Sequence, residues 1–277
     1  MPRPATQSPN LEPFQEEQAQ VHAPLQPVVI HEIIRAEGES DLIKPASALL
    51  LSGLAAGLSM GFSYAGQALL KGALPQAPWA HAVASLGYAV GFAIVVLGRQ
   101  QLFTESTLSA VLPTLTRRDA RTATASLRLW SLVLLANIVG TWLFAAALVF
   151  LHPFGEAPQP AFATLAAEST AYGFLDTAVR GVFAGWLIAM MVWLLPTAGS
   201  ARILIIALLT WLVAFGHLSH IIAGSSEGAF AVMTGAASFA DYWLAFFIPT
   251  LLGNTIGGVA LVALLNHAPI SHKLTDA

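Results

Sequence analysis

Residues Leu212–Phe230 read LVAFGHLSHIIAGSSEGAF, and this stretch decides the fold. It begins as the end of the apolar run Ile203–Phe215 and then turns polar before becoming apolar again. The interrupting residues are Gly216, His217, His220, Gly224, Ser225, Ser226, Glu227 and Gly228. Non-helical backbone at membrane depth is tolerated only where protein or a water-filled cavity covers it. The stretch therefore predicts a broken membrane helix that lines a pathway.

The composition places the chain in membrane lipid. Of the 277 residues, 56% are hydrophobic and 10% are charged, against about 25% charged in soluble domains. The absence of cysteine excludes disulfides and thiolate metal sites, and we expect neither a metal nor a cofactor. A net charge of −3 is too small to indicate a nucleic-acid partner. Residues 1–27 contain no apolar core of a cleavable signal peptide.

Six segments can span a hydrocarbon core that needs about 20 apolar residues. They are Ala46–Leu70, Ala82–Leu115, Arg128–Leu151, Phe174–Leu195, Arg202–Ala236 and Tyr242–Asn266. The second and fifth are too long for one span and carry polar interruptions at Gly98–Ser106 and Gly216–Gly228. We therefore predict an all-α membrane protein with broken second and fifth helices.

The transmembrane domain is predicted to cover residues 45–267, between two terminal segments. Residues 1–27, rich in Pro, Gln and Glu, predict a disordered tail. Apolar residues at helical spacing in 28–44 predict an amphipathic helix that lies on the membrane, packs on a neighbouring subunit or is solvated. Residues 268–277 are expected to form a cytoplasmic tail.

The positions of Lys and Arg predict the orientation. With the N-terminus inside, nine of the twelve fall in cytoplasmic segments and only Lys71 falls in an outer loop. Arg99 and Arg180 lie within spans. Cytoplasmic loops carry an excess of Lys and Arg, so we expect both termini to face the cytoplasm.

The two halves of the chain resemble each other. SGLAAG at 52–57 corresponds to RGVFAG at 180–185, and NIVG at Asn137–Gly140 corresponds to NTIG at Asn254–Gly257. The long helices turn polar at Gly98 and Gly216. Because each half holds three spans, the second copy is inserted upside down, and inverted repeats with broken helices are a transport architecture.

At this point the sequence resembles the formate/nitrite transporter family. The motifs are LFTES at Leu102–Ser106, NIVG at 137–140 and IPTLLGNTIGG at Ile248–Gly258, and GRQQLFTES at 98–106 is similar to the YfdC-like branch. The resemblance covers roughly residues 45–267. It implies a non-enzymatic homopentamer in the bacterial inner membrane, with an aquaporin-like protomer. Each protomer would carry small monovalent anions such as formate or nitrite, often with a proton.

The resemblance also implies pathway residues. Thr104 matches the threonine that faces a central histidine, while Leu102 and Phe103 match residues of two hydrophobic constrictions. Three further side chains fall on constriction positions, with helix packing as the alternative explanation: Tyr88, Phe92 and Ile188.

Two histidines compete for the central position. Aligning His-Ile-Ile-Ala-Gly with the family motif selects His220, whereas aligning Phe-Gly-His selects His217, and the ungapped match favours His220. The family glutamate before the histidine is Ser219 here, and the asparagine after it is Gly224. Gly185 replaces a further family asparagine. The imidazole is expected to offer a hydrogen bond or a proton, since the pKa of histidine is ordinarily about 6.5.

The broken ends carry two additional carboxyls. Glu105 and Glu227 either alter the anion preference or cap a half-helix N-terminus, and capping is the favoured interpretation. In the first break, Thr104 or Ser106 could cap a simple kink without any ligand. A helix that restarts there directs its positive end toward the midplane and attracts anions.

Other classes of function stay open. A channel for water or small neutral solutes shares this plan but expects Asn-Pro-Ala motifs, which the chain lacks. A serine protease would need Ser225 or Ser226 as nucleophile with His217 as base. A non-transporting membrane scaffold or sensor is the third alternative.

Overall fold

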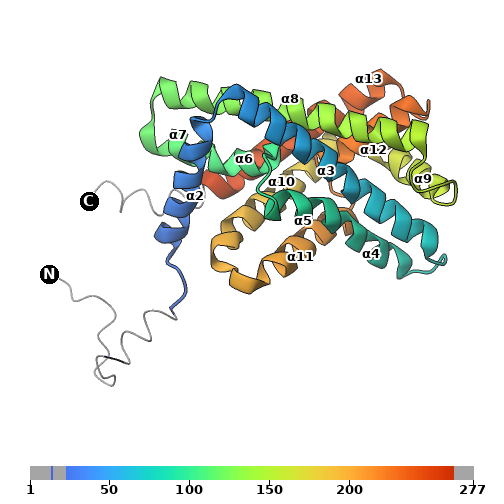
Figure 1. Cartoon of the computed structure of the whole chain (residues 1–277), viewed down its shortest axis with the longest axis horizontal. Coiled ribbons are helices and arrows are strands. Elements are labelled where there is room, and N and C mark those ends of the chain that lie inside the picture. The colour runs from blue at the N-terminus through green and yellow to red at the C-terminus, as the bar shows by residue number, and fades with distance from the viewer. Residues whose placement is uncertain (1–13, 15–22, 265–277) are drawn as a thin grey trace.

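The structure is a computed structural model that describes residue 14 and residues 23–264, the last four by their backbone alone. The predicted C-terminal tail, and the predicted disordered tail apart from residues 14 and 23–27, lie outside the described residues. Within the described part of the chain every regular element is a helix (Figure 1).

The first half of the chain contains a short helix, two long helices and a divided one. Its elements are α2 (Pro27–Leu42), α3 (Ala46–Ala73), α4 (Ala80–Ala84), the 3₁₀ turn η1 (Ser85–Tyr88), α5 (Ala89–Leu97), α6 (Phe103–Ser109), α7 (Val111–Arg117) and α8 (Ala120–Leu151). A segment of five residues, 98–102, separates α5 from α6 and is called the first linker here.

The second half begins with the connecting helix α9 (Gln159–Ser169). It continues with α10 (Phe174–Leu194), η2 (Leu195–Thr197), η3 (Gly199–Ala201), α11 (Arg202–Phe215), α12 (Ala223–Met233), α13 (Phe239–Asp241), the π-helical η4 (Tyr242–Phe247), α14 (Ile248–Thr255) and the π-helical η5 (Ile256–Leu264). Residues 216–222 separate α11 from α12 and form the second linker.

Within the part of the chain that the structure describes, five segments are long and apolar enough to cross a membrane. They are Ala46–Ala73, Ala80–Leu97, Ala120–Leu151, Phe174–Thr197 and Phe239–Ala260. The predicted fifth span, Arg202–Ala236, is divided between α11 and α12, and the apolar helix Gly199–Phe215 is too short to meet the same length criterion.

The third long helix starts earlier than the sequence predicted. We expected a start at Arg128, but α8 begins at Ala120 because Asp119 caps it, with its carboxylate accepting the Thr122 backbone N–H at 2.9 Å. Hydrogen bonds from Thr122 lower the pKa of the Asp119 carboxyl below its ordinary value. The cap extends the helix by two turns beyond the apolar pattern.

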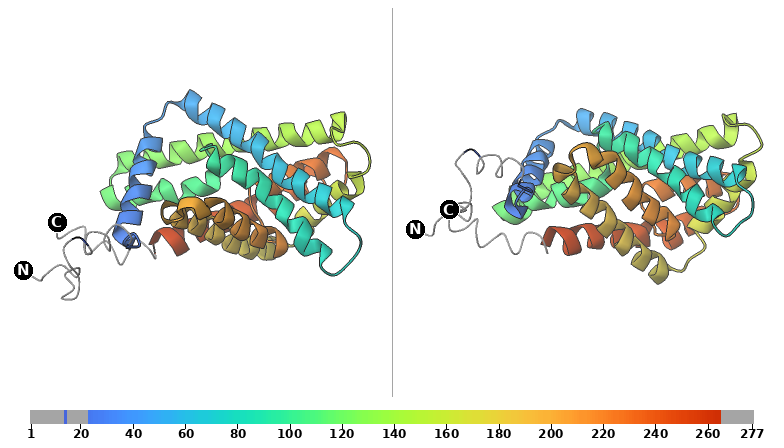
Figure 2. Two further views of the ribbon diagram at one scale, coloured as in Figure 1. Left: turned by 60° about the horizontal axis from the view of Figure 1, so that its bottom comes forward. Right: turned by 90° about the horizontal axis from the view of Figure 1, so that it is seen from below.

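Helices α2 and α9 lie at opposite ends of the helical bundle (Figures 1 and 2). We predicted that α2 would lie on the membrane, on a neighbouring subunit or in solvent. In the structure it also packs against helices of its own chain, which the prediction did not include. Ile34 is buried against α6 and α7 of the same chain. A Cβ on Gly38 would overlap the carbonyl of Ser109, so α2 touches the backbone of α6 directly.

Two close helix pairs form the frame of the bundle. Helix α3 packs along α8, and α10 packs along α14 and η5. A Cβ on Gly57 would overlap the carbonyl of Asn137, and a Cβ on Gly185 would overlap the carbonyl of Asn254. Small residues allow such approach between membrane helices. The glycine that replaces the family asparagine at position 185 is therefore a packing position.

Candidate functional site

Both linkers begin with the same backbone turn. Arg99 has φ 50°, the Arg99 N–H donates to the Val96 carbonyl at 3.2 Å, and the Gln100 N–H donates to the Val95 carbonyl at 3.0 Å. This is the Schellman pattern that ends helices, with an arginine where glycine is usual. The predicted break point Gly98 is the last right-handed residue before the turn.

The second linker repeats this turn with a histidine. His217 has φ 49°, its N–H donates to the Ala214 carbonyl at 3.1 Å, and the Leu218 N–H donates to the Val213 carbonyl at 2.9 Å. Gly216 occupies the position that Gly98 has in the first linker. The two chain reversals are therefore equivalent in backbone conformation.

One buried asparagine fixes the first linker. The Oδ1 of Asn137 accepts the Phe103 N–H at 2.9 Å. Its Nδ2 donates to the carbonyls of Gly53 at 2.7 Å and Gln101 at 2.9 Å. Three bonds from α8 thus tie α3, the linker and the first residue of α6 together. The Ser52 hydroxyl adds a fourth by accepting the Gln101 N–H at 3.0 Å.

A second asparagine fixes the second linker with matching bonds. The Oδ1 of Asn254 accepts the Ile221 N–H at 2.9 Å, and its Nδ2 donates to the carbonyls of Gly181 at 2.9 Å and Ser219 at 2.8 Å. By this correspondence Gln101 is equivalent to Ser219 and Phe103 to Ile221. The residues between them, Leu102 and His220, are equivalent in turn.

The helices after the linkers start sooner than the polar pattern predicted. The helix α6 resumes at Phe103, within the predicted interruption 98–106, and α12 resumes at Ala223, within the predicted interruption 216–228. Two of the polar residues bond within their own turn, because the Ser106 hydroxyl donates to the Leu102 carbonyl and the Ser225 hydroxyl to the Ile221 carbonyl. Hydroxyl groups often bond back to the carbonyl four residues earlier within a helix.

The predicted capping roles have no hydrogen bonds to support them, although Glu105 does lie in the first turn of α6. Neither α6 nor α12 has a side-chain cap at its N-cap residue, and within the described chain no hydrogen bond joins Glu105 or Glu227 to a helix N-terminus. Ser225 and Ser226 lie inside α12 and are buried, so they do not act as N-caps either. The free N–H groups are bonded instead by the asparagines and by His220.

Two predicted pathway residues meet at the centre. The Oγ1 of Thr104 lies 2.9 Å from the Nε2 of His220, and both residues are 1% exposed. The Nδ1 of the same imidazole accepts the Ala223 N–H at 3.2 Å. In the neutral ring the proton is therefore on Nε2, which donates to Thr104. The Thr104 hydroxyl hydrogen then has no further acceptor among the described residues.

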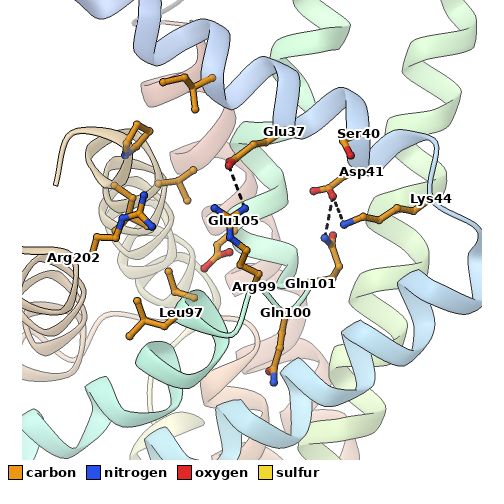
Figure 3. A pocket seen from close by; sticks show the side chains of 15 residues that line it. Glu37, Ser40, Asp41, Lys44, Leu97, Arg99, Gln100, Gln101, Glu105 and Arg202 are labelled. Atoms are coloured by element: carbon orange, nitrogen blue, oxygen red, sulfur yellow. Dashed lines mark hydrogen bonds and ion pairs between the residues drawn. The ribbon is translucent and has the colours of Figure 1, made fainter. Parts of the chain in front are cut away.

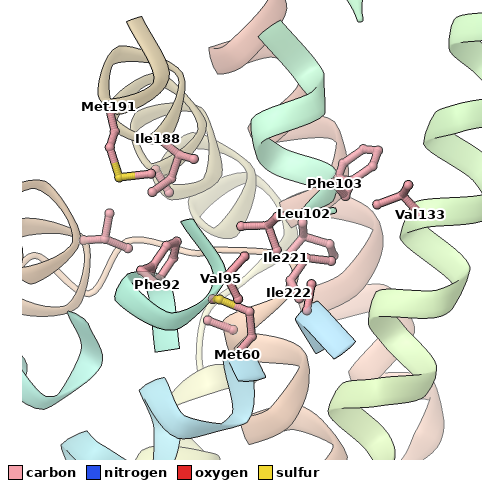
Figure 4. Packing of buried hydrophobic residues seen from close by; sticks show 14 of the residues in the cluster. Met60, Phe92, Val95, Leu102, Phe103, Val133, Ile188, Met191, Ile221 and Ile222 are labelled. Carbon is pink, nitrogen blue, oxygen red and sulfur yellow. The ribbon is translucent and has the colours of Figure 1, made fainter. Parts of the chain in front are cut away.

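Apolar side chains surround this polar pair. The ring of Phe92 meets the imidazole edge to face at 5.0 Å between centroids, and Leu102 and Ile188 are buried in the same cluster (Figure 4). Tyr88 packs on Phe92 at 5.4 Å. The ring of Phe103 turns the other way, toward Val133 and Trp130 on α8.

A cavity of about 340 Å³ lies between α2, the first linker and the start of α11 (Figure 3). Arg99 reaches Glu37 on α2 at 3.5 Å, and the Nε2 of Gln101 donates to Asp41 at 3.1 Å. Glu105 lines the same cavity, and its Oε1 is buried without a hydrogen-bond partner. This space is called the first cavity.

A smaller cavity of about 60 Å³ lies at the end of the bundle that α9 covers. The predicted residues that line it are Tyr88, His217, Ser219, His220, Gly224 and Glu227. His220 thus forms part of the inner wall of this second cavity. A Cβ on Gly224 would press on the ring of Phe246, so this glycine lets α12 pack against η4.

His217 lies at the mouth of the second cavity, away from the central pair. It stacks on His81 with ring centroids 4.6 Å apart and an angle of 5° between the planes, and its Nδ1 lies 3.5 Å from Glu168 on α9. The hydrogen bond from His217, followed by the charge of Lys71, lowers the pKa of the Glu168 carboxyl. The guanidinium of Arg180 donates to the His217 carbonyl at 3.0 Å.

Sequence reasoning missed several of these residues. No local pattern joins His81 to His217 or Glu168 to either, because they come from separate elements. Glu37 was noted only as part of the polar face of a helix, and Asp41 was not singled out. Asn137 and Asn254 did carry a signal, the repeated Asn-x-x-Gly spacing, but it indicated packing and gave no hint of their bonds. Gly140 and Gly257 in the same motifs do pack closely, against α3 and α10.

Comparison with known proteins identifies the family. The family model described as formate/nitrite transporter matches residues 28–268. The chain is 40% identical over 253 residues to the inner membrane protein YfdC of Escherichia coli K12, covering 91% of this chain and 82% of that protein. It is 26% identical over 247 residues to the uncharacterized transporter YrhG of Bacillus subtilis 168, covering 84% and 90%.

Two solved structures share the fold. One is a pentameric formate channel with formate bound, with a TM-score of 0.71, 19% identity and coverage of 81% of this chain and 97% of that one. The other is an ion channel of the FNT family, with a TM-score of 0.76, 17% identity and coverage of 87% and 99%. Members of this family are transporters, not enzymes. This all-helical membrane protein belongs to the formate/nitrite transporter family.

Proposed function

We propose that the chain is a membrane channel or carrier for small monovalent weak-acid anions, and that anion movement is linked to protons. The observation that carries this proposal is the bond between Thr104 and His220. This pair is surrounded by buried apolar side chains and lies between the two cavities, in a region that is called the neck here. Family membership supports the same reading. A polar pair in an otherwise dry neck is the place where a small solute can exchange hydrogen bonds during passage.

The proposal places six spans in the bilayer. They are α3, the divided α4–α7, α8, α10, the divided α11–α12 and the last span from α13 to η5, so each linker interrupts a span. Lys44 lines the first cavity and Gln67 the second. At 1.5 Å per helical residue they are about 34 Å apart along α3, which matches the roughly 30 Å of a hydrocarbon core.

The matching bonds of Asn137 and Asn254 support an inverted repeat of three spans. The distribution of Lys and Arg supports an orientation with both termini in the cytoplasm, in the inner membrane of a bacterial cell. The first cavity then opens to the cytoplasm and the second to the outside. We further propose a homopentamer, following the pentameric channel that shares the fold, with lipid covering the remaining apolar surface.

An anion that crosses the neck loses its hydration, which costs far more for a charge than for a neutral molecule. Protonation removes that cost for a weak acid. At the neck the Thr104 hydroxyl, whose hydrogen is left free by the His220 bond, can donate to the passing solute. Leu102, Phe92 and Ile188 keep water out of the neck.

A substrate panel in proteoliposomes tests the proposal. Uptake of formate, nitrite, lactate, hydrosulfide, acetate and chloride is followed with and without a pH gradient, against protein-free vesicles. We expect uptake of at least one weak-acid anion, faster when the outside is acidic. Uptake of none of them, with intact assembly, would favour the scaffold alternative, and osmotic shrinkage by water flux alone would favour the water channel.

A further inference from the structure

Two half-buried carboxyls lie on either side of the central pair, one facing each cavity. Glu105 directly follows Thr104 on α6 and lines the first cavity. Glu227 is seven residues after His220 on α12, about 10 Å along the helix, and lines the second cavity. These two are the carboxyls nearest to the central pair in sequence.

Neither carboxyl is held in place by an ion pair or a hydrogen bond within the described chain. No ion pair or hydrogen bond joins Glu105 or Glu227 to another described residue, and the Oε1 of Glu105 is buried without a partner. Buried carboxyls in proteins are ordinarily paired or hydrogen-bonded. An unpaired carboxyl at the floor of a cavity is free to exchange its proton with a solute in that cavity.

The central imidazole is poorly placed for proton exchange. Its Nδ1 accepts the Ala223 N–H and its Nε2 bonds Thr104, so both ring nitrogens are engaged. Adding a proton to Nδ1 would set two N–H groups against each other and free the first-turn N–H of α12. The proton of a proton-linked passage must therefore come from other groups.

We propose that Glu105 and Glu227 are the proton-exchange residues of this pathway, one in each cavity. The inference rests on the proposed function and assigns its proton to named groups. In one cavity the O–H bond of a protonated glutamate breaks and an O–H bond forms on the anion, which leaves a carboxylate on the protein and a neutral acid at the neck. Beyond the neck the acid returns the proton to the other carboxylate and leaves as the anion.

The charged and titratable surroundings differ between the two sites. Toward Glu105 the first cavity presents Glu37, Asp41 and Lys44 near α2, Arg99 from the linker and Arg202 from α11, so none of these serves as a neutral control. Toward Glu227 the second cavity presents Tyr88, Glu168, Tyr172, His217 and His220. The basic groups of the first cavity attract the anion, and water in each cavity resets the carboxyl between cycles.

This chemistry selects for weak acids. Transfer of a proton between two carboxylates is close to balanced, because both hold protons with similar strength. Chloride and nitrate are conjugate bases of strong acids and cannot take a proton from a carboxyl group. The carboxyls would therefore pass formate or acetate and reject strong-acid anions of similar size.

The test uses the full chain in proteoliposomes, with labelled formate and a pH dye inside the vesicles. Glu105→Gln and Glu227→Gln keep the size of the side chain but cannot release its proton. We expect each to reduce formate uptake at least tenfold and to flatten its pH dependence. Glu105→Asp should restore much of both, and Glu156→Gln, in the exposed loop before α9 and outside both cavities, should behave as wild type.

Wild-type protein supplies a second measurement that needs no variant. One proton should enter with each formate, above the leak of protein-free vesicles. Formate uptake without proton entry, or Gln variants that keep the wild-type rate and pH profile, would overturn the inference and leave the proposed function standing. Wild-type protein that assembles but moves no anion would overturn both.

Discussion

The two linkers have the same backbone and different side chains. Each starts with a left-handed residue at nearly the same φ, 50° at Arg99 and 49° at His217, and each is held by three asparagine bonds. Yet the equivalent middle positions are Leu102 in one and His220 in the other. The backbone anchoring is thus repeated in both halves, but the side chain at the middle position is not. The imidazole of His220 occurs only in the second half, and its partner Thr104 comes from the first half.

Their covering helices extend the comparison. The carboxylate of Glu37 on α2 lies 3.5 Å from Arg99, and that of Glu168 on α9 lies 3.5 Å from His217. The covering helix is thus paired with an arginine at one end of the bundle and with a histidine at the other.

The largest expected effect comes from variants that remove the asparagine bonds common to both linkers. Asn137→Ala and Asn254→Ala each remove three buried hydrogen bonds. Hydrogen bonds between membrane helices average about 0.6 kcal/mol each, and unsatisfied buried groups add about 1–3 kcal/mol. We expect each variant to lose about 3–5 kcal/mol, measured by thermal unfolding in detergent. Asn137→Asp, which keeps the acceptor, should lose less, and a clear difference between the two alanine variants would contradict the equivalence of the linkers.

The next largest effect is expected from variants that remove the polar pair by which the two linkers differ. His220→Leu gives both middle positions the same residue, and Thr104→Val removes the hydroxyl at constant shape. A hydrogen bond to a charged or ionising solute contributes about 1.5–3 kcal/mol. We expect formate uptake to fall roughly 10- to 100-fold in each, while assembly is retained. Uptake at the wild-type rate in both variants would exclude the pair from the pathway.

A smaller effect sharpens the comparison of the two turns. Non-glycine residues in the left-handed region are strained by about 1 kcal/mol. Arg99→Gly and His217→Gly should each raise the unfolding free energy by about 0.5–1 kcal/mol through relief of this strain. Loss of the surface ion pair and the greater flexibility that glycine gives the unfolded chain both reduce this gain. Ala93→Gly in α5, where the backbone is right-handed, should have the opposite sign at about 1 kcal/mol. Unfolding midpoints measure all three, and a loss of stability in both linker variants would contradict the strain.

The smallest expected effect is a pH dependence of the stability that Glu168 contributes to the folded protein. The pKa of Glu168 is lowered in the folded protein, first by the His217 hydrogen bond and then by Lys71, from an ordinary value of 4.5. The resulting stabilisation is complete above pH 4.5 and is lost as the pH falls through the lower folded pKa. The difference in unfolding temperature between wild type and Glu168→Gln should therefore shrink below pH 4.5. A difference that stays constant down to pH 3 would contradict this linkage.

Much of the frame could be predicted because it follows from spacing and composition. The apolar runs identified the long helices, and the repeated NIVG and NTIG motifs identified the two equivalent asparagines. The exact starts of α6 and α12 could not be predicted, because they depend on distant side chains: Asn137 of α8 bonds the first N–H of α6, and Asn254 of α14 bonds the N–H of Ile221, two residues before α12. Local reasoning looked for caps within the polar stretch and so read Glu105 and Glu227 as helix caps.

The centre of the site was predictable in identity but not in geometry. The motif match selected His220 over His217, and the structure buries the first beside Thr104 and leaves the second at a cavity mouth. Phe103 was expected at a constriction but packs on Trp130, because its backbone position next to Leu102 turns its side chain to the opposite face. The direction in which a side chain leaves a linker depends on bonds that sequence spacing does not encode.

The asparagines anchor each linker through its backbone carbonyls and N–H groups, and these are the same for every amino acid except proline. Residues 102 and 220 can therefore be exchanged without loosening the anchor that holds them. A lineage of such proteins could acquire a new cargo by altering a few inward-facing side chains, while the helical architecture around them stays untouched.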